Sequence, residues 1–164
     1  MKAILMILAF TALAACSQDD EDMNGFNLEN QIYFSLKNSD GQNLLDTETE
    51  NSININDIQL YYLIDDEPVE VTIENGYNMG SIELTSDKLL KVFTNPSSSN
   101  IIDETSEYEV VENIAYLKFS ETDTDTIKTH SKSSQNYFLL SEVWYNDELV
   151  WERETGGVIE IMKE

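Results

Sequence analysis

Short runs of alternating apolar residues constrain the fold of this chain more than any other feature of its sequence. From about residue 31 onward, turn-forming residues separate these runs from one another. No window sustains a 3.6-residue period beyond about two turns, which argues against a long helix. We expect strands at 31–36, 58–64, 69–73, 81–85, 89–94, 114–119 and 158–161, together with a hairpin over 137–153.

The spacing of these runs predicts the architecture. Eight or nine short strands separated by turns are typical of an antiparallel β-sandwich, here of the immunoglobulin-like kind, and an open barrel is the alternative. The roughly 134 residues after residue 30 are enough for one hydrophobic core. Neither an internal repeat nor a second linker divides them, so we expect a single domain over residues 31–164.

Two tryptophans flank the turn expected at Asn146–Asp147 in the hairpin. Asn adopts a positive φ readily, as a two-residue turn requires. With that turn, Trp144 lies opposite Leu149, and Trp151 lies opposite Glu142. Trp144 and Trp151 then share a face with Leu149, and we expect this face to belong to the core.

The first sixteen residues have the features of an export signal. Lys2 supplies a positive charge, residues 3–12 form an apolar run, and Leu13-Ala14-Ala15-Cys16 follows. The run is too short for a permanent membrane span, which needs about 20 apolar residues. The segment resembles a bacterial lipoprotein signal, which implies cleavage between Ala15 and Cys16 and a membrane anchor of palmitate-like acyl chains on Cys16. The alternatives are an ordinary secretory signal with an incidental cysteine, or an uncleaved anchor.

An acidic stretch, Asp19-Asp20-Glu21-Asp22, follows the cysteine. Four consecutive acids repel one another, and the stretch has no apolar periodicity, so we expect a disordered tether over residues 16–30. The stretch also resembles the export signal of surface lipoproteins in the Bacteroidota. That resemblance implies the outer membrane and the cell surface. The alternatives are a solvated linker without an export role, and the periplasmic face of the outer membrane.

Several further segments resemble a group of small uncharacterised lipoproteins of the Bacteroidota. They are residues 38–46, 58–62, 121–127 and 143–151. Asp147 departs from the glycine that the resemblance leads us to expect after Asn146. The resemblance implies an envelope location and a β-rich domain, and it brings no activity, ligand or catalytic residue.

Composition excludes several classes of function. The chain has 32 acidic and 9 basic residues and a formal net charge of −23, which disfavours binding to nucleic acid. One cysteine and one histidine, His130, leave no internal disulfide and no cysteine-based or two-histidine metal site. His130 lies in a polar, loop-like segment without a nucleophile motif, so we expect it to have no catalytic role. We do not expect an enzyme, although a small hydrolase that uses a carboxylate pair is an alternative.

Two groups of residues are candidates for ligand contacts. Glu121, Asp123 and Asp125 are spaced by two and could converge on Ca²⁺ in a loop, but in a strand they line one solvent face. We expect the strand arrangement and no cofactor. Tyr61 and Tyr145 are the aromatic residues best placed for an exposed, glycan-binding patch. We therefore expect a lipid-anchored binding or structural module with a protein or glycan partner, and a glycan-binding surface lipoprotein is the alternative.

Overall fold

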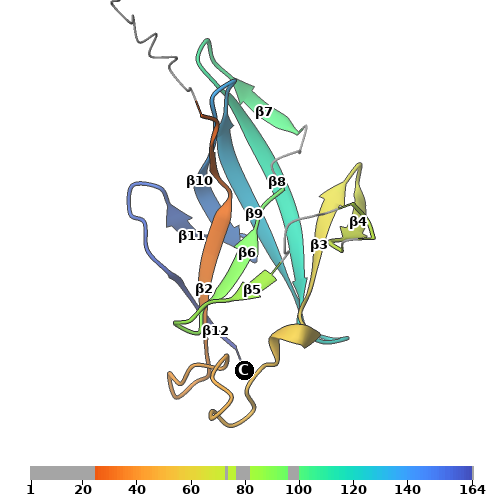
Figure 1. Ribbon diagram of the computed structural model, residues 1–164, viewed down its shortest axis with the longest axis vertical. Helices are drawn as coiled ribbons and strands as arrows, with labels where there is room; N and C mark the ends of the chain where they lie inside the picture. Colours follow the sequence, from red (N-terminus) through yellow and green to blue (C-terminus); the bar gives the residue numbers. More distant parts are fainter. Residues whose placement is uncertain (1–24, 73, 77–81, 96–99, 164) are drawn as a thin grey trace, which may run out of the picture.

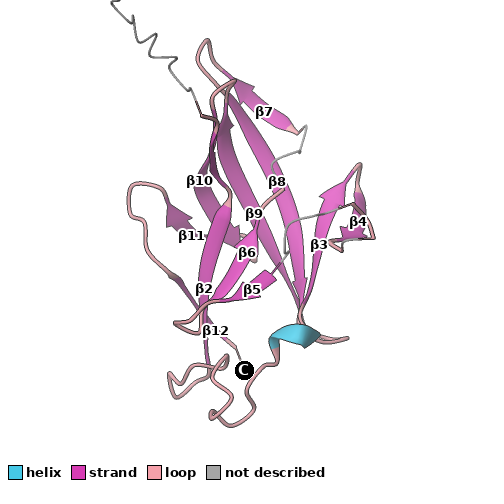
Figure 2. Cartoon of the chain, viewed as in Figure 1, coloured by secondary structure: helices cyan, strands magenta, loops and turns pink. Residues whose placement is uncertain are grey.

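Two β-sheets packed face to face make up the structure, a computed structural model that describes residues 25–72, 74–76, 82–95 and 100–163. These residues form twelve strands and one short 3-10 helix, η1 (Ile55–Asp57) (Figures 1 and 2). The sheets do not close into a barrel, so the predicted all-β sandwich is confirmed. No helix among the described residues is long and apolar enough to cross a membrane.

Three long antiparallel strands form the centre of the larger sheet. They are β8 (Glu109–Lys118), β9 (Thr124–Ser133) and β10 (Tyr137–Tyr145). Two short strands pair along each outer edge of this group. On one edge, β3 (Gln59–Ile64) and β7 (Ile101–Glu104) pair with β8, and β4 (Glu67–Glu70) pairs in turn with β3. On the other edge, β1 (Asn27–Glu29) and β11 (Glu148–Glu152) pair with β10. Short edge strands expose few unpaired backbone groups in a row, which limits edge-to-edge association.

The smaller sheet has four strands. Their order is β12 (Ile159–Met162), β2 (Gln31–Lys37), β6 (Leu90–Phe93) and β5 (Ile82–Leu84). β12 runs parallel to β2, and the backbone N–H of Lys163 donates to the carbonyl of Lys37 at 2.8 Å. This pairing brings the last described residue to the end of the domain where β2 ends.

Alternating side chains from both sheets form the core between them, because successive residues of a strand point to opposite faces. Phe34 of β2 packs against Tyr145 of β10, with ring centroids 5.7 Å apart, and so joins the two sheets. The largest fully buried apolar side chains are Phe34, Phe138, Leu36, Leu60, Leu90, Leu117, Ile127, Val92 and Val143.

The apolar pattern does not reveal β9, the central strand of the larger sheet. The segment around His130, expected to be loop-like, lies within this ten-residue strand. The buried residues of β9 are Asp125, Ile127, Thr129 and Ser131. Only one of them is apolar, so the strand lacks the alternation that would predict it. Backbone pairing with β8 on one side and β10 on the other holds it in place.

The domain begins earlier than predicted. Residues Asn27–Glu29 form β1, and Asn30 is buried, with its Nδ2 donating to the carbonyl of Thr94 at 3.0 Å. Residues 27–30 therefore belong to the folded domain and not to a tether over 16–30. The earlier part of that tether, together with Ala15 and Cys16, lies outside the described residues.

A β-bulge changes the two faces of the C-terminal hairpin. Trp144 pairs with Leu149 as predicted, but Trp151 pairs with Val143, because the register shifts between Val143 and Trp144. Val143 is fully buried and Trp151 packs against the core, whereas Trp144 is half-buried on the outer face and Leu149 is 45% exposed. The prediction that Trp144, Leu149 and Trp151 share a core face is therefore wrong. A bulge adds one residue to a strand, so alternation cannot be counted through it.

The predicted turn at Asn146–Asp147 contains two residues with positive φ, 48° and 68°. Asn146 is bound to β9, since its Oδ1 accepts the N–H of Thr126 at 2.8 Å and its Nδ2 donates to Asp125 at 2.7 Å.

We expect Asp147→Gly to raise the free energy of unfolding by up to about 1 kcal/mol, because glycine adopts this conformation without strain at Cβ. Urea unfolding measures the change. Asp147→Ala, which keeps the strain, is the control, and lower stability of Asp147→Gly would contradict the expectation.

Candidate functional site

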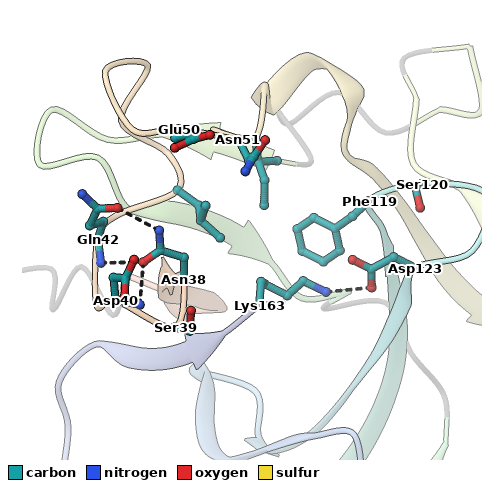
Figure 3. A pocket seen from close by; sticks show the side chains of 12 residues that line it. Asn38, Ser39, Asp40, Gln42, Glu50, Asn51, Phe119, Ser120, Asp123 and Lys163 are labelled. Carbon is teal, nitrogen blue, oxygen red and sulfur yellow. Dashed lines mark hydrogen bonds and ion pairs between the residues drawn. The ribbon is translucent and has the colours of Figure 1, made fainter.

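A pocket of about 480 Å³ opens at the end of the sandwich where β2 and β12 end (Figure 3). The loop after β2 and the turn between β8 and β9 form its two sides. Its polar lining consists of Asn38, Ser39, Asp40, Gln42, Glu50, Asn51, Ser120, Asp123 and Lys163, and its apolar lining of Leu44, Ile53 and Phe119. We call this cavity the end pocket.

The side chain of Asn38 holds the loop side of the end pocket in place. Its Oδ1 accepts hydrogen bonds from the backbone N–H groups of Asp40 and Gln42, at 3.1 and 2.9 Å. Its Nδ2 donates to Oε1 of Gln42 at 3.0 Å (Figure 3). Gly41 completes the turn with a φ of 76°. Asn side chains that bond to nearby backbone in this way order a turn, so this side of the pocket is formed without a ligand.

Lys163 joins the two sides of the end pocket. Its Nζ lies 2.8 Å from Oδ1 of Asp123 and also binds Oδ2 of Asp125. The same ammonium group lies 3.9 Å from the centroid of the Phe119 ring. The Lys163 side chain is only 11% exposed, so it depends on these partners to replace the water it has lost.

Asp125 is the centre of a buried network behind the end pocket. Besides Lys163, it binds the hydroxyl of Tyr145 and Nδ2 of Asn146. Burial raises the pKa of this carboxyl group, but hydrogen bonds from Asn146, Lys163 and Tyr145 lower it by more. Burial, together with the hydrogen bond to Asp125, raises the pKa of Tyr145. The network therefore combines an ionised carboxylate with a protonated phenol.

The carboxylates considered for Ca²⁺ have lysine partners. Asp123 and Asp125 both bind Lys163, and Glu121 lies 3.1 Å from the ammonium group of Lys118. Within the described parts of the chain, no group of three or more His, Cys, Asp or Glu side chains is arranged to hold a metal ion. The ammonium group of Lys163 binds both Asp123 and Asp125. Asp125 is buried in β9, so the expectation that these acids line one solvent face is wrong for Asp125.

Tyr61 and Tyr145, predicted to form an exposed patch, lie on opposite faces of the larger sheet. Tyr145 is 8% exposed and packs on Phe34, so the prediction that it faces a ligand is wrong. The reason is that Val143 and Tyr145 point into the core between the two sheets, whereas Trp144 points to the outer face. Tyr61 is half-buried on the outer face of the larger sheet, opposite Tyr116 in the register, and ligand binding there stays a prediction.

His130 lies on the outer face of β9 between two glutamates. Its Nδ1 lies 2.9 Å from Oε2 of Glu142, and its Nε2 lies 3.2 Å from Oε2 of Glu112. The Trp144 ring lies beside it, with centroids 4.4 Å apart. Because both ring nitrogens face carboxylates, this geometry does not direct the imidazole at a hydroxyl or thiol nucleophile.

Comparisons with known proteins do not assign the chain to a family. It matches no family model, no curated protein and no solved structure. The structure defines the class of protein as a two-sheet β-sandwich with a preformed, mostly polar pocket at one end.

Proposed function

We propose that this protein is a lipid-anchored module of the bacterial outer membrane, exposed at the cell surface, that acts by binding or as a structural accessory and not as an enzyme. The observation that carries the proposal is Leu13-Ala14-Ala15-Cys16 directly after a short apolar run. Two or three acyl chains on Cys16 hold a protein stably in a bilayer, whereas one chain holds it only marginally. The acidic residues 19–22 support the surface location.

The position of the end pocket suits an anchored binding module. The described chain begins beside the start of β10, where Asn27 lies opposite Tyr137 (Figure 1). The end pocket adjoins the network around Asp125, at the other end of the same sheet. The nine residues of β10 make eight steps of about 3.3 Å, so these ends lie roughly 26 Å apart. In this proposal, the anchor reaches the domain at the end opposite the pocket, which supports a role for the pocket in binding away from the membrane.

The network behind the end pocket does not make Asp125 a general acid. A carboxylic acid that serves as a general acid near neutral pH needs a raised pKa. Despite its burial, the pKa of Asp125 is held below its ordinary value by the groups that donate to it. A small hydrolase that uses a carboxylate pair is the alternative, and a pocket carboxylate found by NMR titration to have a raised pKa would favour it.

Cys16→Ala is expected to abolish incorporation of radiolabelled palmitate and to move the protein from the detergent phase to the aqueous phase in a phase-partitioning assay. The physical reason is that Cys16 is the only cysteine in the chain, so the variant has no thiol to carry an acyl chain. Ser17→Ala, which keeps the cysteine, is the matched control and should retain the label. Palmitate label that persists in Cys16→Ala would contradict the proposed anchor.

Protease treatment of intact cells tests which leaflet of the outer membrane carries the protein, since only a surface-exposed domain is degraded.

A further inference from the structure

The end pocket has the size of a small-molecule site. Its volume of about 480 Å³ lies within the usual range, roughly 300–1,000 Å³. The lining includes three carboxylates, which we call the rim, and three apolar side chains, which we call the wall. The rim consists of Asp40, Glu50 and Asp123, and the wall of Leu44, Ile53 and Phe119. Sites for organic ligands are usually mostly apolar, so the mostly polar lining of the end pocket favours a ligand with many hydrogen-bonding groups.

The charge of the lining selects against anions. Lys163 provides the single ammonium group among the lining residues, and it is already bound to Asp123 and Asp125. An anionic ligand would approach Asp40 and Glu50 without a free cation to offset the repulsion. Among the described residues, no three His, Cys, Asp or Glu side chains are arranged to hold a metal ion, so the lining does not point to one.

Neutral hydrogen-bonding chemistry fits the remaining groups. Carboxylates accept hydrogen bonds from hydroxyl groups, and these charge-assisted bonds are stronger than neutral ones. The side-chain amides of Gln42 and Asn51 can both donate and accept. A sugar carries hydroxyl groups around its ring and C–H groups on its faces, so it complements both the rim and the wall.

We infer that the end pocket binds a neutral saccharide, an inference that rests on the proposed role of the protein as a surface binding module. Asp40 and Glu50 accept hydrogen bonds from the sugar hydroxyl groups, and the apolar wall contacts the C–H face of the ring. The loop held by Asn38 is ordered before the sugar arrives, so binding loses less conformational entropy.

The test uses the full-length lipoprotein in a detergent without a sugar headgroup. An array of neutral and uronic-acid oligosaccharides is screened, and the strongest neutral probe is titrated calorimetrically. We expect binding of neutral probes, with uronic-acid analogues about tenfold weaker or more, and a loss of about tenfold in affinity for Asp40→Ala and for Glu50→Ala. Glu154→Ala removes an exposed carboxylate outside the pocket and should bind like the parent protein.

The inference is overturned if no neutral saccharide binds, or if uronic-acid probes bind as well as neutral ones. It is also overturned if Asp40→Ala and Glu50→Ala bind like the parent protein. A further contrary result is that Tyr61→Ala abolishes binding while Asp40→Ala and Glu50→Ala do not. The last result would place the site on the outer face of the larger sheet. Asp40 and Glu50 are exposed, so the urea midpoints of Asp40→Ala and Glu50→Ala should equal that of the parent protein. Equal midpoints show that a loss of binding does not come from unfolding. If no saccharide binds but Cys16 still carries lipid, saccharide binding is rejected while the proposed membrane anchor stands.

Discussion

Phe34→Ala is expected to lower the free energy of unfolding by about 3–5 kcal/mol. Phe34 is fully buried in β2, and its ring packs against Tyr145 of the opposite sheet. The substitution removes a contact between the sheets and leaves a cavity that the close-packed neighbours fill only in part. Because single domains are typically stable by only about 5–15 kcal/mol, the variant should be close to unfolding, as a strongly lowered urea midpoint would show.

Trp144→Ala is the matched control for that experiment, since it removes a larger aromatic ring. Trp144 is half-buried on the outer face, where Nζ of Lys128 lies 4.6 Å from the centroid of its ring. Cross-strand and cation–π contacts of this kind contribute about 1–2 kcal/mol together. If Trp144→Ala were as destabilising as Phe34→Ala, the outward position of the tryptophan would be wrong.

Asp125→Asn is expected to destabilise the domain by about 3–5 kcal/mol at pH 7, although it scarcely changes the size of the side chain. The substitution removes the negative charge that faces Lys163 and places an NH₂ group among donors from Tyr145 and Asn146. The ammonium group of Lys163, 11% exposed, then loses a buried partner that water cannot readily replace. Urea unfolding at pH 7 measures the loss.

The effect of Asp125 should depend on pH in a defined direction. Its pKa is raised by burial and lowered by more through its hydrogen bonds, so in the folded protein it lies below the unfolded value of about 3.9. The stabilisation is therefore complete above about pH 4 and is lost as the pH falls through the folded pKa. The difference in stability between the parent protein and Asp125→Asn should be constant from pH 5 to 7 and shrink below about pH 4. A difference that grows on acidification would contradict this assignment.

Asp123→Asn provides the control for the same network. Asp123 binds the same ammonium group at 2.8 Å, but its side chain is 45% exposed. Exposed ion pairs contribute only about 0–1 kcal/mol, because water screens them and competes for both charges. An equal loss of stability in Asp123→Asn and Asp125→Asn would show that burial does not distinguish the two carboxylates.

Much of the sheet structure follows from local sequence. The run at residues 31–36 lies within β2, and 58–64 contains β3, because each has apolar or β-branched residues at a period of two. The turns follow local chemistry as well. Asp65 and Asp66, like Asn146 and Asp147, have positive φ and connect antiparallel neighbours directly.

The end pocket is less accessible to sequence reasoning. Asp123 and Asp125 stand out by their spacing, but the spacing suggests a cation, and the partner in the structure is Lys163. Thirty-eight residues separate Lys163 from Asp125. No local pattern encodes a contact over that separation, because it depends on the parallel pairing of β12 with β2.

The sequence by itself determined that much of the chain forms strands joined by tight turns, since backbone period and turn conformation depend on neighbouring residues. Only the tertiary structure decided that Tyr145 faces the core while Trp144 does not, and that β9 is the central strand despite its polar inward residues. The physical reason is that a bulge, the burial of a polar side chain and a contact between distant strands each depend on what the neighbouring strands provide. Their free energy therefore belongs to the packed sheets and not to any one segment.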